Sequence, residues 1–366
     1  MKVVEIDKNN FKNNIEVIKK ITQESPNTKI YAVVKGNGGG LDIVKYSKFL
    51  IENGITSLAV ATYEECLKLR NAEIKEEILM LSPVSIEEEM RQLVEKNIIL
   101  TIGDYEELEL LKKVSKDLNV EKCKAHLKID TGFGRYGILY SNIEEIIKVL
   151  ESAENIEIEG MFSHFSKAID EKMTKVQFER FINVVKAVEE KNLRPKILHI
   201  SSSTAFLKYP EMRLDAVRIG SLFQGRSLVK NIGLTPVGVL KSRITEIKTV
   251  PKGYTISYGN TYITKRETKL ATIPIGHMDG LNKLPVREDF SLRNNIIAIL
   301  MEIKKLFKDN SFKVKINNKE YKILGRIGLC HVTVDITGSD DIKTGDEVIL
   351  NVHPMNVNEE IRREYV

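Results

Sequence analysis

The sequence has few cysteines, no long hydrophobic run and no block of like charge, and each of these absences excludes a class of protein. Cys66, Cys123 and Cys330 are odd in number, far apart and not spaced as metal ligands, which argues against a disulfide framework and a metal site. No stretch of ~18 apolar residues is available to span a membrane, and residues 1–5 lack the apolar centre of a signal peptide. We therefore expect a cytoplasmic protein without a membrane partner.

Charge of one sign is not concentrated anywhere along the chain. Lysine and arginine total 56, aspartate and glutamate total 51, and the two signs are interspersed. No basic segment could follow a phosphate backbone, so a nucleic-acid partner is not expected. Hydrophobic residues make up 42% of the 366 residues, which suits two globular domains or one large barrel with an appendage.

Short apolar runs alternate with amphipathic segments of helical period over the first 230 residues. The candidate strands are residues 31–35, 57–62, 78–82, 98–102, 124–130, 158–164, 196–201 and 216–220. Eight strands alternating with helices predict a (β/α)8 barrel. The alternative is a doubly wound sheet, which requires a G-x-G-x-x-G fingerprint after its first strand, and the glycine-rich segment 36–40 does not have that spacing.

The pattern changes near residue 230, where the alternation of strands and helices ends. Strands predicted at 237–250, 254–262, 269–275, 313–323 and 347–351 indicate a mainly antiparallel β domain. One amphipathic helix, predicted at 291–307, interrupts this domain. We therefore predict a barrel over residues 1–230 and a β domain over 231–366, with the first few residues as candidates to join the β domain.

Polar side chains follow the predicted barrel strands at their carboxyl ends, where the active sites of such barrels lie. These side chains are Lys35, Asp130, His164, His199, Ser203, Arg218 and Ser221. A partly desolvated lysine is suited to form a Schiff base, because its amine loses its proton more readily than in water. Serine hydroxyls and backbone amides after the last two strands suit a phosphate. A phosphate-bearing aldehyde cofactor, pyridoxal 5′-phosphate (PLP), meets both requirements.

Short segments spread over nearly the whole chain carry a resemblance to a known family. They are residues 32–35, 126–132, 134–137, 160–165, 199–200, 215–220, 257–262, 273–276, 279–280, 324–326, 334–335 and 345–347. In this order they resemble the alanine racemase family. The resemblance implies a PLP-binding barrel, a β domain and a head-to-tail homodimer in which each active site takes residues from both subunits.

The resemblance also implies roles for the cofactor site. Lys35 would hold PLP and act as one of two acid–base groups, Arg218 would face the pyridine nitrogen, and His164 and His199 would orient the cofactor or Arg218. The phosphate ligands would be Ser203, Gly220 and Ser221. A strand-end ion pair for Lys35 or Arg218 and a simple helix cap for the serines are the alternatives.

Arg135 would pair with the substrate carboxylate or with the opposing catalytic residue, and the backbone N–H of Leu329 would bind the substrate carboxylate. Lys128 matches a position where the family lysine can be carbamylated and then holds the arginine, and an ordinary pair with Asp130 is the alternative. The second catalytic base of the family is a tyrosine from the partner subunit, and this chain has His277 there. A phosphate-binding tyrosine of the family is likewise replaced, by Gly39.

These residues indicate a PLP-dependent racemase that interconverts L- and D-amino acids, with alanine or a larger amino acid as substrate. Lys35 and His277 would act on opposite faces of the substrate Cα. A one-base PLP enzyme, such as a decarboxylase or an aldolase, is one alternative. A non-catalytic PLP-binding protein on the same fold is another.

Overall fold

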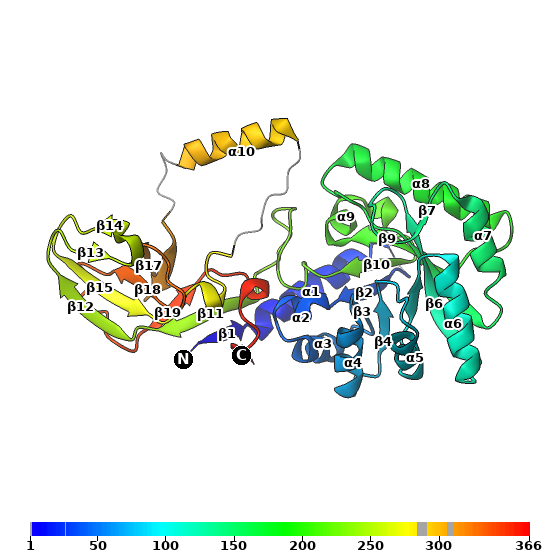
Figure 1. Ribbon diagram of the computed structural model, residues 1–366, viewed down its shortest axis with the longest axis horizontal. Coiled ribbons are helices and arrows are strands. Elements are labelled where there is room, and N and C mark those ends of the chain that lie inside the picture. The colour runs from blue at the N-terminus through cyan, green and yellow to red at the C-terminus, as the bar shows by residue number, and fades with distance from the viewer. Residues whose placement is uncertain (1, 26, 284–290, 306–310) are drawn as a thin grey trace. The chain divides into compact units, whose positions relative to one another are not determined.

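The computed structural model describes residues 2–25, 27–283, 291–305 and 311–366. The chain forms two compact units (Figure 1). One contains Asp7–Val237, and the other combines the chain up to Ile6 with Gly238–Val366. The first is mainly helices around a parallel sheet and the second is mainly antiparallel sheet.

The first unit is a (β/α)8 barrel, as predicted. Its parallel strands run in the order β4-β3-β2-β10-β9-β8-β6-β5. They are β2 (Lys29–Val33), β3 (Ser57–Val60), β4 (Glu77–Met80), β5 (Leu100–Ile102), β6 (Cys123–Asp130), β8 (Ile156–Phe162), β9 (Ile197–Ser202) and β10 (Ala216–Ile219). A parallel bridge between Leu79 and Ile99 joins the two ends of this order. This closure excludes the open doubly wound sheet.

Helices surround the barrel, and most of them begin at a side chain that accepts hydrogen bonds from backbone amides. Asp104, for example, accepts from Glu107 N at the start of α6, where the acidic Glu106 and Glu107 also suit the positive end of the helix. The helices are α1 (Lys8–Thr22), α2 (Lys35–Gly39), α3 (Ile43–Glu52), α4 (Tyr63–Asn71), α5 (Glu87–Glu95), α6 (Tyr105–Asp117), α7 (Ile143–Glu151), α8 (Glu171–Glu189) and α9 (Ser203–Lys208). A two-residue strand, β7 (Ile138–Leu139), pairs with β6.

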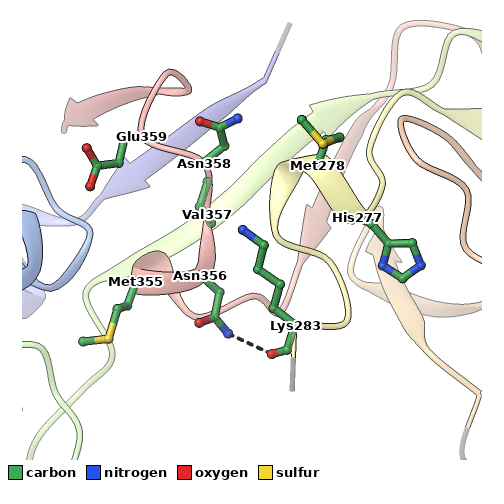
Figure 2. Close-up of a pocket in the computed structure, with 8 residues that line it drawn as sticks. All are labelled: His277, Met278, Lys283, Met355, Asn356, Val357, Asn358 and Glu359. Atoms are coloured by element: carbon green, nitrogen blue, oxygen red, sulfur yellow. Dashed lines mark hydrogen bonds between the residues drawn. The ribbon is translucent and has the colours of Figure 1, made fainter. Parts of the chain in front are cut away.

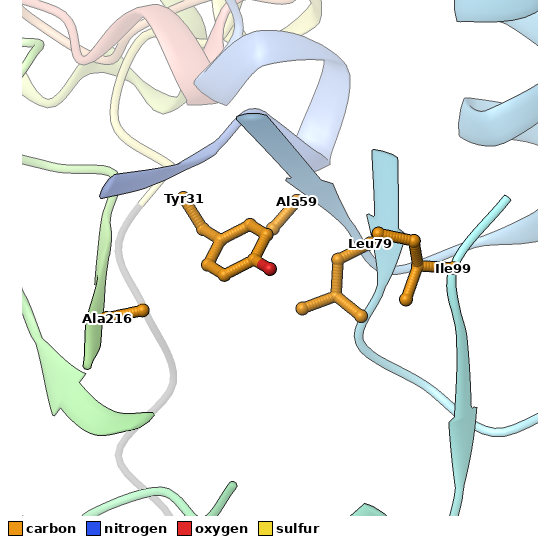
Figure 3. Close-up of a cluster of buried hydrophobic side chains, with 5 residues drawn as sticks. All are labelled: Tyr31, Ala59, Leu79, Ile99 and Ala216. Carbon is orange, nitrogen blue, oxygen red and sulfur yellow. The ribbon is translucent and has the colours of Figure 1, made fainter. Parts of the chain in front are cut away.

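One part of the barrel interior is a cluster of buried, mainly apolar side chains. Figure 3 shows its members directed toward one another: Tyr31, Ala59, Leu79, Ile99 and Ala216. At most 3% of the surface of each is exposed. Burial of aromatic and aliphatic side chains of this size is the main force that holds such strands together.

Along each strand, every second side chain points to the same side. A residue that points into the barrel is therefore followed, two positions later, by another that does. On β6, His126, Lys128 and Asp130 share a side, and each is at most 6% exposed. Gly160 on β8 pairs with His126, and a Cβ atom at Gly160 would lie 2.5 Å from the His126 ring. The absence of a side chain at 160 therefore makes room for the imidazole.

Because this space is already filled, Gly160→Ala is expected to lower the free energy of unfolding by ~1–3 kcal/mol, the usual cost of overpacking a core. Denaturant titration measures the loss. In a His126→Ala background the same substitution should cost less, because the ring it strikes is gone. An equal cost in both backgrounds would contradict this placement of the ring.

The second unit is a nine-stranded sheet in the described residues, with the order β12-β15-β18-β17-β16-β19-β11-β1-β20. Its pairs are antiparallel except that of β1 with β20. The strands are β1 (Val3–Ile6), β11 (Gly238–Arg243), β12 (Glu246–Val250), β15 (Thr268–Ile273), β16 (Lys313–Ile316), β17 (Lys319–Leu324), β18 (Val332–Asp335), β19 (Glu347–Leu350) and β20 (Arg362–Tyr365). A separate hairpin pairs β13 (Thr255–Ile256) with β14 (Tyr262–Ile263).

Three strands predicted as continuous are each divided in two. Residues 237–250 form β11 and β12, because the first pairs with β19 and the second with β15. Residues 313–323 form β16 and β17 around Asn317 and Asn318, whose positive φ values of 47° and 65° build a two-residue hairpin turn. Residues 254–262 contain a turn with positive φ at Ser257.

The predicted inserted helix is present as α10 (Leu292–Lys305), and its predicted end at Phe307 lies outside the described residues. Its apolar side chains include Leu292, Ile299 and Leu300, which are all exposed. Within the described chain, no helix is both long and apolar enough to cross a membrane.

Candidate functional site

Lys35 lies two residues beyond the end of β2 and begins α2 at the carboxyl end of the barrel. Its side chain is open to solvent, yet the surrounding protein lowers the pKa of its ammonium group below the ordinary value. Partial loss of water is the largest cause, the cations of Arg135 and Arg218 add to it, and Glu65 opposes it. The amine of Lys35 is therefore more readily neutral, and more nucleophilic, than that of an ordinary surface lysine.

The loop after Lys35 is a left-handed turn. Gly36, Asn37 and Gly38 have φ values of 66°, 52° and 68°, a conformation that costs most side chains roughly 1–2 kcal/mol per residue. The amides of Gly36 and Asn37 donate to the carboxylate of Glu65, at 2.6 Å and 3.4 Å. These two amides therefore hold a carboxylate of the protein itself.

The position of the family tyrosine is filled by another side chain. A Cβ atom at Gly39 would lie 1.9 Å from Nε2 of Gln224, which donates to the carbonyl of Gly38. Gln224 is largely buried. A side chain at position 39 would therefore collide with Gln224.

Arg218 is held on β10 by acceptors from two neighbouring strands. Its Nη1 donates to His199 Nδ1 at 2.6 Å and to the His199 carbonyl at 3.2 Å. Its Nη2 donates to the carbonyl of Ser163 at 2.6 Å, to His164 Nδ1 at 2.9 Å and to the carbonyl of Ile200 at 3.2 Å. In the part of the chain that the structure describes, no protein acceptor takes the Nε–H group, which stays available for a ligand.

Both histidines that contact Arg218 are neutral. Burial, followed by the charge of Arg218, lowers the pKa of His164 and of His199 well below the usual range. Burial also lowers the pKa of Arg218, to about 9, so the guanidinium stays charged at neutral pH. Arg218 is therefore a fixed cation that donates hydrogen bonds and accepts no proton.

The predicted phosphate ligands lie together at the ends of β9 and β10. The amide of Gly220 donates to Oγ of Ser203, at 3.1 Å, and Ser203 is the first residue of α9. Ser221 follows directly and is exposed. Hydroxyl and amide groups thus gather at the mouth of the barrel, next to the strand that carries Arg218.

Lys128 is a buried lysine without a counter-charge in contact. Its residue is 5% exposed, and among the described residues its Nζ has no hydrogen-bond partner. The expected alternative, a pair with Asp130, is not formed, because the Asp130 carboxylate accepts from the amides of Gly132, Phe133 and Gly134. Burial and the charge of Arg218 lower the pKa of Lys128 well below its usual value.

Arg135 follows in the loop that Asp130 holds. Its guanidinium lies 4.4 Å from the ring centre of Phe133 and 5.7 Å from that of Tyr136. It also borders a cavity of about 440 Å³ together with Glu107 and Asp130. Desolvation raises the pKa of Glu107 to about 7. The arginine is thus exposed and stacked, with its donors open to a ligand carboxylate.

His277 and Leu329 lie side by side in the β unit. The amides of His277 and Met278 donate to the carbonyls of Gly328 and Leu329, each at 3.0 Å. Gly276 permits this approach, since a Cβ atom there would lie 2.3 Å from the Leu329 carbonyl. The N–H of Leu329 has no hydrogen-bond partner within the described residues, so it can donate to a ligand.

The His277 side chain has a defined proton position. Its Nδ1 lies 3.1 Å from the carbonyl of Leu281, so Nδ1 carries the proton and donates it to that oxygen. Nε2 is then the free, basic nitrogen. His277 also borders a cavity of about 420 Å³ in the β unit, whose lining residues are drawn in Figure 2: His277, Met278, Lys283, Met355, Asn356, Val357, Asn358 and Glu359.

The structure brings the barrel residues of the prediction together, while two residues that matter here were not predicted. Glu65 holds the loop after Lys35, and Ser163 accepts from Arg218 through its backbone. Neither contact could have been found from a sequence motif. Glu65 reaches the loop from a different helix, α4, and Ser163 acts through its backbone carbonyl, which does not depend on the residue type. Within the described residues, no group of histidine, cysteine, aspartate and glutamate side chains is arranged to hold a metal ion.

Comparisons with known proteins agree on one family. Residues 6–227 match the family model described as alanine racemase, N-terminal domain, and residues 237–363 match that described as alanine racemase, C-terminal domain. Alanine racemase of Methanococcus maripaludis is 36% identical over 353 residues, which are 94% of this chain and 87% of that protein. Alanine racemase 2 of Caldanaerobacter subterraneus is 33% identical over 356 residues, 95% of this chain and 84% of that protein.

Solved structures give the same result. Alanine racemase of Clostridium difficile superposes with a TM-score of 0.87 at 28% identity, covering 100% of this chain and 95% of the other. Alanine racemase of Bacillus anthracis, with bound L-Ala-P, has a TM-score of 0.83 at 28% identity, with the same coverage of both chains.

Proposed function

The chain belongs to the alanine racemase family and is a racemase, and we propose that it interconverts L- and D-alanine with PLP bound through Lys35. The observation that carries this proposal is that the same barrel mouth contains Lys35, whose pKa is lowered, and the buried cation of Arg218. The Cα–H of an amino acid is only weakly acidic, so its removal needs both a base and a sink for electrons.

The residues present fit PLP. The lowered pKa of Lys35 suits a covalent bond to the cofactor aldehyde, the free Nε–H of Arg218 suits the pyridine nitrogen, and Ser203, Gly220 and Ser221 suit the phosphate. When bound, the cofactor withdraws the electrons left on Cα. Arg218 would face the ring nitrogen as a donor that does not give up its proton, and so would keep that nitrogen unprotonated, which would weaken the sink and suppress reactions other than proton return.

Two bases on opposite faces of Cα complete the proposal. Lys35 Nζ carries a proton on one face, and His277 Nε2 accepts or returns one on the other. In each direction one group removes the proton while the other supplies one, so the enzyme ends each turnover with its two protonation states exchanged. The N–H of Leu329 and the guanidinium of Arg135 hold the substrate carboxylate.

Lys128 is proposed to be carbamylated. Carbamylation joins a neutral amine to carbon dioxide with release of one proton, and the lowered pKa of Lys128 favours that neutral amine. The carbamate would convert an unpartnered buried amine into an anion that can hold Arg135. This change would satisfy both groups at once, since neither has an acidic partner within the described residues.

Lys35 and His277 belong to different compact units, and we propose that two copies of the chain form a homodimer with shared active sites. The β unit of one chain would supply His277 and Leu329 to the barrel of the other. A cytoplasmic location is proposed because Cys66, Cys123 and Cys330 are all free thiols, and Cys330 is exposed.

The proposed reaction is tested with L-alanine in heavy water. We expect D-alanine to form, and deuterium to appear at Cα of both enantiomers, because each face exchanges its proton with a base that exchanges with solvent. Chiral chromatography with mass spectrometry measures both. A panel of larger amino acids serves as the comparison and should be turned over more slowly.

Other outcomes assign other functions. Label in one enantiomer without interconversion would indicate a one-base PLP enzyme. Faster turnover of a larger amino acid would overturn alanine as the substrate. No label in any amino acid, with PLP firmly bound, would indicate a binding protein.

A further inference from the structure

A continuous row of polar side chains crosses the barrel interior from its amino end to Arg218. Lys124 Nζ lies 2.8 Å from Oε2 of Glu159, and Oε1 of Glu159 lies 3.7 Å from His126 Nε2. His126 Nδ1 lies 2.8 Å from His199 Nε2, and His199 Nδ1 accepts from Arg218 at 2.6 Å. Both histidines are fully buried, and the Glu159 side chain is 8% exposed.

The contacts allow only one arrangement of protons along this row. Because Arg218 can only donate, His199 Nδ1 must be unprotonated, and neutral His199 then carries its proton on Nε2. That proton is donated to His126 Nδ1, so neutral His126 carries its own proton on Nε2. The His126 Nε2–H faces Oε1 of Glu159 across 3.7 Å, which is longer than a hydrogen bond, and neither atom has a hydrogen-bond partner in the described residues, so the attraction between them is electrostatic.

The backbone is shaped to build this row. Between β6 and β8 the register shifts, with Ala125 opposite Ile158 and His126 opposite Gly160, so Glu159 is an extra residue in β8. A bulge of this kind turns a side chain that would otherwise follow the alternation of the strand. It directs Glu159 toward Lys124 and His126, while Gly160 leaves the space that the His126 ring occupies.

We propose that Glu159 and His126 are positioning residues that fix the proton of His199 on Nε2 and thereby keep His199 Nδ1 as the acceptor that holds Arg218. The catalytic consequence rests on the proposed function, in which Arg218 faces the pyridine nitrogen. Loss of the acceptor would leave one Arg218 donor unpaired and free the guanidinium to turn. Neither Glu159 nor His126 would touch substrate or cofactor.

The charges around the row favour this arrangement. Burial alone would raise the pKa of Glu159, but the ion pair with Lys124 and the nearby His126 ring lower it to about 2, so Glu159 is an anion at neutral pH. Burial lowers the pKa of His126, which keeps it neutral. Glu77 and Lys29, the other charged groups that face His126, contact each other and so offset one another.

The native protein provides the first test. With 15N-labelled histidine, the ring nitrogens of His126 and His199 report which of them carries the proton, and single histidine substitutions assign the signals. We expect Nε2–H at both residues, in the PLP-loaded enzyme and in the cofactor-free protein. Nδ1–H at either residue would overturn the proposal, and this outcome does not depend on any activity.

Glu159→Gln provides the second test, because it keeps the shape and removes the charge. Lys124 should draw the amide oxygen of Gln, which turns the NH2 group toward His126 Nε2. To accept from that NH2 group, His126 carries its proton on Nδ1, and His199 likewise, so the new contact competes with the bond from Arg218 to His199 Nδ1 and breaks it where the flipped form is populated. We expect Nδ1–H signals at both rings and a fall in kcat of about tenfold, the effect of one hydrogen bond to a charged group, with KM within about twofold.

Glu157→Gln is the matched control. Glu157 lies on the same strand, and its carboxylate pairs with the exposed Lys196 at 3.0 Å, away from the histidines. The Glu157→Gln substitution should change neither the ring signals nor kcat.

If Glu159→Gln leaves Nε2–H on His199, the proposal is wrong, even where the variant is slow. If alanine proves not to be a substrate while the native signals are as expected, the proposed function fails and the row of proton positions stands.

Discussion

Lys35→Ala is expected to reduce alanine racemisation by roughly 1,000-fold or more, because the substitution removes two functions of one side chain. Loss of a general acid–base group alone typically costs 10²–10⁴-fold in rate. The covalent attachment of PLP is lost as well. Enzyme loaded with excess PLP, and assayed by chiral chromatography, measures the fall. Lys45→Ala is the control, because Lys45 lies on α3 and its ammonium group is within 3.9 Å of Asp42.

The attachment itself can be located without reference to activity. Borohydride reduces the bond between PLP and a lysine to a stable amine, and peptide mapping then identifies the labelled residue. We expect the label on Lys35, because Lys35 is an exposed lysine at the barrel mouth and its pKa is lowered. A label on Lys128 or on any other lysine would show that the cofactor assignment is wrong.

The barrel could be predicted from the sequence because its signal is repeated. Eight apolar runs separated by segments of helical period are compatible with few fold topologies. In a closed parallel barrel, the carboxyl ends of all strands lie at the same end of the barrel. Lys35, His164, His199 and Arg218 were predicted as site residues for that reason; Lys35 and His164 lie just beyond their strands, and His199 and Arg218 lie within theirs. The contacts among them follow from the closure of the barrel, which the bridge between Leu79 and Ile99 completes.

The features that escaped prediction depend on single residues in space. The bulge at Glu159 cannot be recognised from the pattern of apolar residues. One added residue changes only which face of the sheet the following side chains point to. The amides of Gly36 and Asn37 donate to Glu65, which is 28 or more positions away, and no local sequence pattern marks this contact. In the β unit, Asn317-Asn318 forms a hairpin turn with a weaker sequence signal than Asn-Gly.

His277 is the residue on which the proposed stereochemistry depends most. Gly276 lets the segment pass close to Leu329, and the bond to the Leu281 carbonyl fixes the proton on Nδ1. Nε2 is thereby presented as a base without further rearrangement. A tyrosine ordinarily titrates near ~10 and must be activated to accept a proton at neutral pH, whereas a histidine titrates near ~6.5 and needs little adjustment.

His277→Ala is therefore expected to reduce racemisation by about 100-fold or more while PLP remains bound, because Lys35 and the phosphate ligands are untouched. His277→Tyr should restore much of the rate, because a tyrosine hydroxyl can serve as the acid–base group at this position. Mixing Lys35→Ala chains with His277→Ala chains should recover part of the activity, since one of the two shared sites in each mixed dimer keeps both groups. Verified mixed dimers without recovery would contradict sharing. A His277→Ala enzyme with the parent rate and pH profile would show that water or another residue serves this face of Cα.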